Sequence, residues 1–546
     1  ISYITCMDSY AKIGDAHNNL RILSLMEKSF KNGNSQAKPT RRAYVSALNS
    51  LAKSGRGDAG TRAEALVQTM EKLSQAGNSE LKPDTTVYNV LINCHKNSAA
   101  RAEKVLYRMG KRDVVSYSSV MNVYSKMGGV TAAKRAQALL DEMQNEDVKP
   151  NAHTFNSAIT AWSRSGSKGG AQKAEGLLKK MEGLHEAGNS DLQPSAQIYT
   201  SVISAWAKSS NEPGAALRAE ILLKLMWAMY KRGNKSMRPN THTFTSVINA
   251  WARSRDKEAG ERAEALIDQM IKLYEMGDSD VKPNVLTFTS AIHAYARNGV
   301  RDAASKADGI LKKMESIGVK PNLQTYNVLI SLYGNSQGQG AGMKAESILT
   351  KLEDEYQNGD KDMRPSVVSY TSCINAWAKS TDYGKAERAN KILDRMKEMF
   401  NNGVIADQPN CFSYTAVINA CATTYGEQGE KQEAFRIAYS VFREMSESED
   451  LSPNHVSYST FLRAISKLMP HGEKKASMVS ACFRLCIRDG QCDSNCLFHM
   501  KNAASPDLVS DLLGCSDNYE AASMTIDELP FDWHCNVKNS SSRSRE

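Results

Sequence analysis

The chain has 546 residues, of which 41% are hydrophobic and 24% are charged, which is too long for one ordinary hydrophobic core. The 69 Lys and Arg residues exceed the 60 Asp and Glu residues, and the formal net charge of +9 favours a polyanionic partner without establishing one. No apolar run approaches the roughly 18 residues that a membrane-spanning helix needs, so we expect no transmembrane segment.

The 11 cysteines are mostly scattered at apolar helix positions, as at Cys94, Cys373 and Cys421. This pattern is typical of reduced core cysteines in a protein that is not secreted. The chain begins at Ile1 and not at Met, within a repeat, so we expect any targeting segment to lie outside the given sequence.

One phrase recurs along the chain: a basic residue, Pro and Asn or Ser, then Thr or Ser followed by an aromatic residue. Arg238-Pro239-Asn240 with Thr243-Phe244 is an example. A fixed period of this kind predicts a repeat array, in which each unit contacts only its neighbours. Ending each unit just after its Pro gives units 1–40, 41–84, 85–113, 114–151, 152–195, 196–240, 241–284, 285–322, 323–366, 367–410, 411–454 and 455–493.

Unit 241–284 shows what each repeat contains. Phe244, Val247, Ile248 and Trp251 are spaced i, i+3, i+4, i+7 and predict one apolar face of a first helix, and Ala263 to Met270 repeats the pattern on a second helix. Each pair must stack on its neighbours to bury both helices, so we expect an all-α solenoid of about twelve helix-turn-helix units. The equivalents of Trp251 are predicted to be core residues: Trp162, Trp206, Tyr295, Tyr333 and Trp377.

Three polar positions recur in the units. The fifth position, after the aromatic residue, is polar except in the first two units, where Ile4 and Val45 cannot make a polar contact. It is Asn, Ser or Thr in the others: Asn89, Ser118, Asn156, Thr200, Thr245, Thr289, Asn327, Thr371, Thr415 and Ser459. The junction position, which ends the unit, is Asp, Asn or Ser: Asp84, Asp113, Asn151, Ser195, Asn240, Asn284, Asn322, Ser366, Asn410 and Asn454. The thirteenth position is basic in most units: Lys12, Lys53, Lys126, Arg164, Lys208, Arg253, Arg297, Lys379 and Lys467.

These positions allow two interpretations. The fifth-position residues are good helix caps, although a cap would also tolerate Asp or Gly. Alternatively, because eight residues along a helix return to nearly the same face, a hydrogen-bonding side chain and a cation share one side of the first helix in nearly every unit. Such a face suits a single nucleic-acid strand.

At these residues the chain resembles the pentatricopeptide repeat family over residues 1–493, most closely in units such as Thr325-Tyr326-Asn327-Val328. The resemblance implies a right-handed superhelical solenoid that binds single-stranded RNA, one base per repeat, and acts on transcripts of mitochondria or plastids. The family favours Val or Ile at the second position of the unit. Val115, Val368 and Val456 agree with that preference, whereas His153, Gln197, His242 and Gln324 do not.

The resemblance implies that the fifth and junction positions of a unit read one base together. Asn89 with Asp113 resembles a U reader, Asn156 with Ser195 and Asn327 with Ser366 resemble C readers, and the other pairs resemble A readers: Ser118 with Asn151, Thr200 with Asn240, Thr245 with Asn284, Thr289 with Asn322, Thr371 with Asn410 and Thr415 with Asn454. Ser459 with Asp493 would read G. The expected site is 5′-UACAAACAA-3′, and the expected phosphate contacts are Lys53, Lys126, Arg164, Lys208, Arg253, Arg297 and Lys379.

Other classes of function fit the sequence less well. A protein-binding scaffold of tetratricopeptide type lacks its Trp-x2-Leu-Gly-x2-Tyr pattern here. His471-Gly472-Glu473 followed by Cys482 and Cys486 misses the deaminase spacing, so we expect no enzymatic activity and no cofactor. Cys482, Cys486, Cys492, Cys496 and His499 form a cluster for which helix packing is the first interpretation and metal binding the alternative. We expect a monomer, a degenerate helical cap in 494–546 and a disordered polar tail at 539–546.

Overall fold

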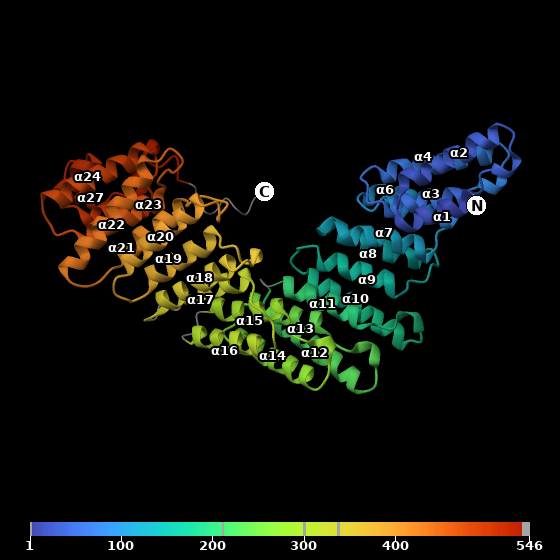
Figure 1. Ribbon diagram of the computed structural model, residues 1–546, viewed down its shortest axis with the longest axis horizontal. Coiled ribbons are helices and arrows are strands. Elements are labelled where there is room, and N and C mark those ends of the chain that lie inside the picture. Colours follow the sequence, from blue (N-terminus) through green and yellow to red (C-terminus); the bar gives the residue numbers. More distant parts are fainter. Residues whose placement is uncertain (1–2, 210–211, 299–301, 336–338, 538–546) are drawn as a thin grey trace. The chain divides into compact units, whose positions relative to one another are not determined.

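A computed structural model of the chain describes residues 3–209, 212–298, 302–335 and 339–537 (Figure 1). These residues form an all-α fold of helix pairs and short 3-10 turns, and no strand occurs among them. The predicted polar tail at 539–546 lies outside the described residues.

The first helices of the units are α1 (Tyr3–Ile13), α3 (Arg41–Lys53), α5 (Thr85–Cys94), α7 (Val114–Met127), α9 (Ala152–Ser163), α11 (Ala196–Lys208), α13 (Thr241–Arg253), α15 (Val285–Asn298), α17 (Leu323–Asn335), α19 (Val367–Lys379), α21 (Cys411–Ala422), α23 (His455–Leu468) and α25 (Ser494–Ala503). The second helices are α2 (Ala16–Lys31), α4 (Ala59–Gln75), α6 (Ala99–Arg108), α8 (Val130–Asn145), α10 (Gly170–Glu186), α12 (Ala215–Lys231), α14 (Ala259–Glu275), α16 (Ala303–Ser316), α18 (Ala341–Gln357), α20 (Lys385–Asn401), α22 (Gln428–Glu447), α24 (Glu473–Arg488) and α26 (Pro506–Leu513). The short helix α27 (Asn518–Ser523) follows.

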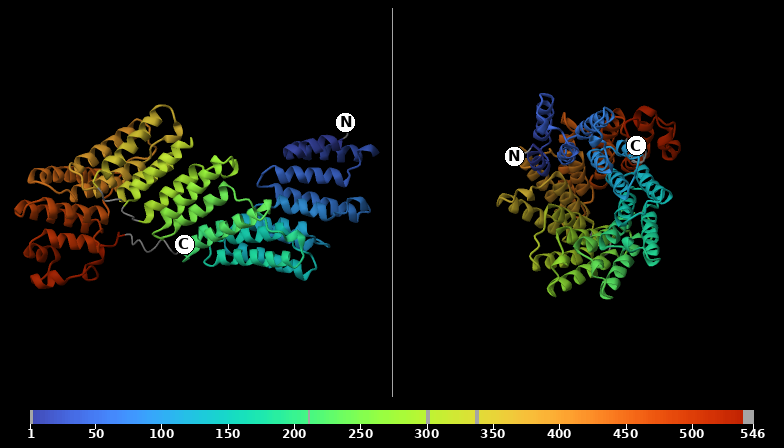
Figure 2. Two further views of the ribbon diagram at one scale, coloured as in Figure 1. Left: turned by 90° about the horizontal axis from the view of Figure 1, so that it is seen from below. Right: turned by 90° about the vertical axis from the view of Figure 1, so that its right-hand side faces the viewer.

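The chain divides into two compact units, one of residues 1–254 with 273–282 and one of residues 255–272 with 283–546. In the first, the first helices stack in chain order from α1 to α13, each against the next (Figure 1). In the second, α15, α17, α19, α21, α23 and α25 stack in the same way. Most second helices pack against the first helix of their own unit. Figure 2 shows the helix pairs from two further directions.

The first helices begin where a junction side chain caps them. Asn240 in extended backbone precedes α13, and its Oδ1 accepts a hydrogen bond from the Thr243 backbone N–H at 3.0 Å. The Thr243 hydroxyl in turn accepts from the Asn240 N–H at 3.4 Å, which completes a capping box. Second helices begin differently, since Gly169, Gly214, Gly340 and Gly384 precede them in the left-handed region that favours glycine.

The predicted apolar faces form the core. Phe244, Val247 and Ile248 on α13 and Ile267 and Met270 on α14 are fully buried. The recurring Trp and Tyr residues are core residues as predicted, with exposed fractions of at most 7% at Trp162, Trp206, Trp251, Tyr295, Tyr333 and Trp377. This burial confirms the assignment of these rings to packing.

Each of these rings also makes a polar contact with the preceding unit. Trp377 Nε1 donates a hydrogen bond to Glu346 Oε2 at 3.1 Å, and Trp206 Nε1 donates to Glu175 Oε2 at 2.9 Å. Glycine makes room for the ring, because a Cβ at Gly342 would lie 2.5 Å from the Trp377 indole. The ring therefore fixes the spacing of neighbouring units by shape and by a hydrogen bond.

In six units, the segment between the second helix and the next unit contains a 3-10 turn. These turns are η1 (Ser35–Ala37), η2 (Ser79–Leu81), η3 (Ser190–Leu192), η4 (Lys235–Met237), η5 (Ser279–Val281) and η6 (Lys361–Met363). Each turn buries one residue, such as Met237 at 1% exposure, so the segment is anchored to the core. Arg238 also forms ion pairs with Asp278 and Asp280, at 2.5 and 3.2 Å. These segments are thus ordered turns, and the ion pairs of Arg238 connect η4 with η5.

The C-terminal region continues the helical packing. Helix α25 packs on α23, and α26 packs on α24 and α25. The 3-10 turns η7 (Ile526–Glu528) and η8 (Phe531–Trp533) follow α27. Among the described residues, no helix is long and apolar enough to cross a membrane.

Candidate nucleic-acid interface

Most junction side chains cap the first helix that follows them, as Asn151 does, whereas Ser195 makes no side-chain cap hydrogen bond before α11. Asn151 Oδ1 accepts from the backbone N–H groups of His153 and Thr154 at 3.0 and 3.1 Å, and Asp113 Oδ1 accepts from the Ser116 N–H at 2.7 Å. The capping role that the sequence offered for the fifth position therefore belongs to the junction position. Residues of the fifth position lie one turn inside the helix, which begins directly after the junction residue.

The fifth and junction positions are joined by a short chain of hydrogen bonds. The Thr289 hydroxyl lies 2.7 Å from the hydroxyl of Thr325, the third residue of the next unit. The Thr325 hydroxyl donates to Asn322 Oδ1 at 2.9 Å. The same connection recurs from Thr371 through Ser413 to Asn410, from Thr415 through Ser457 to Asn454, and from Thr200 through Thr243 to Asn240.

This chain determines which atoms of the junction residue can contact a ligand. Asn322 Oδ1 is used by the Thr325 N–H and hydroxyl, so the group left for an incoming ligand is the Nδ2 amide, a donor. Asp113 Oδ1 accepts from Ser116 in the same way, so the group left is the second carboxylate oxygen, an acceptor. Burial raises the pKa of Asp113, but hydrogen bonds from the Ser116 side chain and backbone outweigh it, and the pKa is lowered.

Two fifth-position amides have an unsatisfied acceptor. The Oδ1 atoms of Asn89 and Asn327 are buried and have no hydrogen-bond partner among the described residues. Asn89 Nδ2, by contrast, donates to Asp113 Oδ1 at 3.5 Å. A buried acceptor without a donor costs about 1–3 kcal/mol, so a ligand N–H at these two atoms would be favourable.

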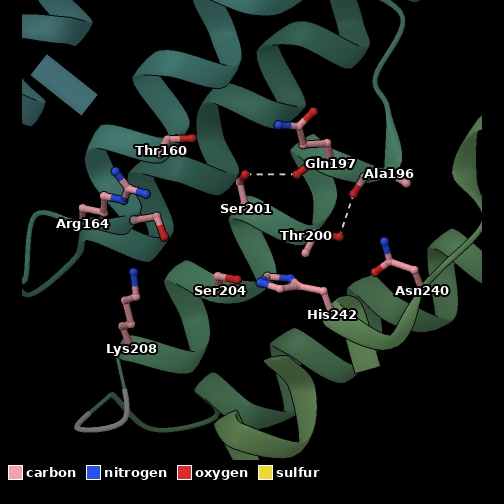
Figure 3. A pocket seen from close by; sticks show the side chains of 11 residues that line it. Thr160, Arg164, Ala196, Gln197, Thr200, Ser201, Ser204, Lys208, Asn240 and His242 are labelled. Atoms are coloured by element: carbon pink, nitrogen blue, oxygen red, sulfur yellow. Dashed lines mark hydrogen bonds between the residues drawn. The ribbon is translucent and has the colours of Figure 1, made fainter. Parts of the chain in front are cut away.

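The three recurring positions meet around one cavity of about 550 Å³ between α9, α11 and α13 (Figure 3). Thr200 and Asn240, the fifth and junction residues of unit 196–240, line it. Arg164 and Lys208 from the thirteenth position lie on the opposite side in the same view. His242, at the second position, adds an exposed aromatic ring. The cavity thus combines hydrogen-bonding groups, a flat ring and cations.

The seven predicted phosphate-binding cations are all exposed: Lys53, Lys126, Arg164, Lys208, Arg253, Arg297 and Lys379. Among the described residues, none of them forms an ion pair, whereas cations on second helices do, as Arg218 does with Glu175. Burial lowers the pKa of Lys208, and the charges of Arg164 and Arg253 lower it further. Lys208 therefore interacts electrostatically with Arg164 and Arg253, its equivalents in the two neighbouring units.

The second position of the unit carries exposed apolar residues other than the Val that the family resemblance identified. Val115, Leu286, Val368, Phe412 and Val456 are apolar and between 45% and 72% exposed. Leu286 and Phe412 were missed because only Val and Ile were expected there. Their signal is visible in the sequence, since an apolar residue two positions before the buried aromatic residue falls outside the apolar face.

The cysteines of the C-terminal cluster are buried. Cys482, Cys486, Cys492 and Cys496 are at most 2% exposed. Within the described ranges, no group of three or more His, Cys, Asp or Glu residues could hold a metal ion. The four thiols pack in the core between α24 and α25.

Comparison with known proteins gives two family matches. Residues 273–336 and 352–424 match the pentatricopeptide repeat domain, and residues 112–164 match the PPR repeat family. A mitochondrial pentatricopeptide repeat-containing protein of Arabidopsis thaliana is 31% identical over 165 residues, 29% of this chain and 34% of that protein. A chloroplastic one from the same organism is 33% identical over 106 residues, 18% of this chain and 12% of that protein. The chain thus spans between 12% and 34% of the length of the curated relatives it matches.

Among solved structures, the pentatricopeptide repeat protein PPR10 in complex with an 18-nt psaJ RNA element is similar. The identity is 19%, the coverage is 91% of this chain and 61% of that chain, and the TM-score is 0.34. Yeast Rmd9p in complex with a 16-nt target RNA is 9% identical over 91% of this chain and 86% of that chain, with a TM-score of 0.30.

Proposed function

The chain is a pentatricopeptide repeat protein, and we propose that it binds single-stranded RNA with one base per unit. The observation that carries this proposal is the repeated chain of hydrogen bonds from the fifth position to the junction position, with a cation nearby in the same cavity. That arrangement offers a directed donor or acceptor to a base edge and a positive charge to a phosphate.

The atoms left over at the junction position suggest how bases are distinguished. An Asn amide donates, so it suits the ring nitrogen acceptor of adenine or cytosine. An Asp carboxylate accepts, so it suits the ring N–H of uracil or guanine. Asn322 and Asp113 exemplify the two cases, and the unsatisfied Oδ1 of Asn89 would add an acceptor beside Asp113. The junction atoms separate A and C from U and G, and the choice within each pair follows from the fifth residue by resemblance to the family. On both grounds we propose 5′-UACAAACAA-3′ as the preferred site for units 85–113 to 411–454.

We further propose a role in organellar RNA processing, stability or translation, because relatives are named as mitochondrial or chloroplastic proteins. The full chain acts as a binding protein in this proposal, without an enzymatic step or a cofactor. Pentatricopeptide repeats read single-stranded RNA with one base per repeat, which supports RNA as the class of ligand at the level of the family.

The test is fluorescence anisotropy with labelled 5′-UACAAACAA-3′ and the full chain. We expect the single strand to bind and a scrambled RNA of the same composition to compete at least about tenfold less well, since one wrong base costs about 1–3 kcal/mol in comparable base readout. The same RNA annealed to its complement should compete poorly. Equal competition by all three RNAs would reject the proposal and favour a protein-binding scaffold.

A further inference from the structure

The hairpin of α25 and α26 repeats the geometry of the reading units. Asp493 caps α25 and accepts from the Cys496 N–H at 2.7 Å, as Asn454 accepts from the Ser457 N–H at 3.0 Å in the preceding unit. Cys496 Sγ lies 3.2 Å from the carbonyl oxygen of His455, so α25 stacks on α23 in register. Counting from the cap, the fifth position of this hairpin is residue 498.

That position holds an aromatic ring in place of a hydrogen-bonding side chain. Phe498 is 60% exposed, although its neighbours Leu497 and Met500 are buried. The His499 ring lies edge-on to it, with centroids 5.2 Å apart. A Phe side chain cannot read a base edge by hydrogen bonding, but it can stack on the face of any base.

The end of the array explains why a ring is suited to this place. In the reading units, the fifth residue connects to the third residue of the next first helix, as Thr415 connects to Ser457. After α26, the next helix is the six-residue α27, which packs against α26. A hydrogen-bonding reader at residue 498 would lack that partner helix, whereas a stacking ring needs none.

Two cations lie on α23, the helix that packs against α25. Arg463 on α23 is half-buried, its Nη2 donates to Asn419 Oδ1, and its Nε is buried without a hydrogen-bond partner among the described residues. Lys467 is exposed and forms no ion pair within the described ranges. Burial and the charges of Arg463 and Lys467 lower the pKa of His499, whereas the charge of Asp493 raises it.

We propose that Phe498 is a terminal stacking platform, which binds one nucleobase of any kind at the 3′ side of the RNA site while Arg463 and Lys467 bind its phosphate. The inference rests on the proposed function and on its parallel polarity. It adds a contact to the eleventh nucleotide, counted from the U of the proposed site, after one nucleotide opposite unit 455–493.

The test measures the affinity of the full chain for 5′-UACAAACAAG-3′ and for the same RNA with one more 3′ nucleotide, carrying A, C, G, U or no base. Each of the four bases should raise the affinity at least about fivefold over the abasic RNA, with differences of less than about twofold among them. The gain should persist in Phe498→Trp and disappear in Phe498→Ser.

Phe531 provides a matched control, because it is a second exposed Phe with a His ring edge-on, at a centroid distance of 5.6 Å. Phe531→Ser should keep the gain. Equal affinity for the abasic and base-carrying RNAs, or a strong preference for one base, would overturn the platform while the binding of the ten-nucleotide RNA still supports the proposed function. Failure of every RNA to bind would reject the proposed function itself.

Discussion

The seven cations of the thirteenth position, which form no ion pair among the described residues, predict a steep salt dependence of RNA binding that substitution of these cations should reduce. Each phosphate contact to a single strand contributes about −0.7 to the slope of log affinity against log salt. Seven engaged cations give a slope of about −4.9, so a fourfold rise in salt should weaken binding about 900-fold. Replacing Arg164, Lys208 and Arg253 by Gln removes three contacts, which should change the slope to about −2.8 and the loss to about 50-fold.

The control for this experiment removes the same number of charges elsewhere. Arg62, Arg436 and Arg443 are exposed and form ion pairs within their own segments, with Asp58, Glu433 and Glu447. Their triple replacement by Gln should leave the slope unchanged, because paired surface cations are not available to phosphates. Fluorescence anisotropy between 50 and 200 mM salt measures both variants. Equal slopes for the two triple variants would refute the assignment of the thirteenth-position cations to phosphate binding.

Three further predictions concern substitutions at individual sites, the first of them a pair. Asn327→Thr combined with Ser366→Asn should move the preference of that unit from C to A by about 1–3 kcal/mol, measured by competition between the two RNAs, and an unchanged ranking would show that the pair does not read the base. Gly342→Ala should lower stability by about 1–3 kcal/mol in urea unfolding, because the added Cβ would meet Trp377 at 2.5 Å, whereas Gly176→Ala in open space should stabilise α10 by up to about 1 kcal/mol; equal effects would contradict the packing argument. Burial lowers the pKa of His95, so the contribution of this residue to the free energy of unfolding decreases as the pH falls below about 6.5. The difference in unfolding midpoint between wild type and His95→Gln should therefore shift in favour of the variant from pH 7.5 to pH 5.5. A difference that is independent of pH would contradict the role of burial.

The repeating pattern of apolar residues was sufficient to predict the helix faces, since Phe244 and Trp251 on α13 and Met270 on α14 are buried as their spacing requires. The pattern did not identify the capping position. Asn, Ser and Thr, which are all good capping residues, occur at both the junction and the fifth position, and only the start of the helix decides which position is the cap. The sequence also did not predict that the segments before the junctions form ordered 3-10 turns, since Gly, Asn and Ser before Met237 are typical of any loop.

The sequence predicted a degenerate helical cap in 494–546, but it did not predict that α25 and α26 repeat the geometry of the other units. Phe498 replaces the polar fifth residue and no Pro precedes Asp493, so the recurring phrase is lost although the geometry is kept. The site residues themselves were predicted from their position in the repeat, and their role in binding stays a prediction. Their connection through Thr325 and its equivalents could not be predicted from the sequence. A hydrogen bond between residues 36 positions apart, such as Thr289 and Thr325, leaves no local pattern.

Selection from a random pool of single-stranded RNA, followed by sequencing of the bound molecules, tests the central claim most directly. The account predicts one enriched motif resembling 5′-UACAAACAA-3′, with the A-rich centre most strongly enriched, because Thr200 and Thr289 are joined to their junction residues in the same way. Enrichment of an unrelated motif, of hairpin stems or of no motif would contradict base reading by the fifth and junction positions.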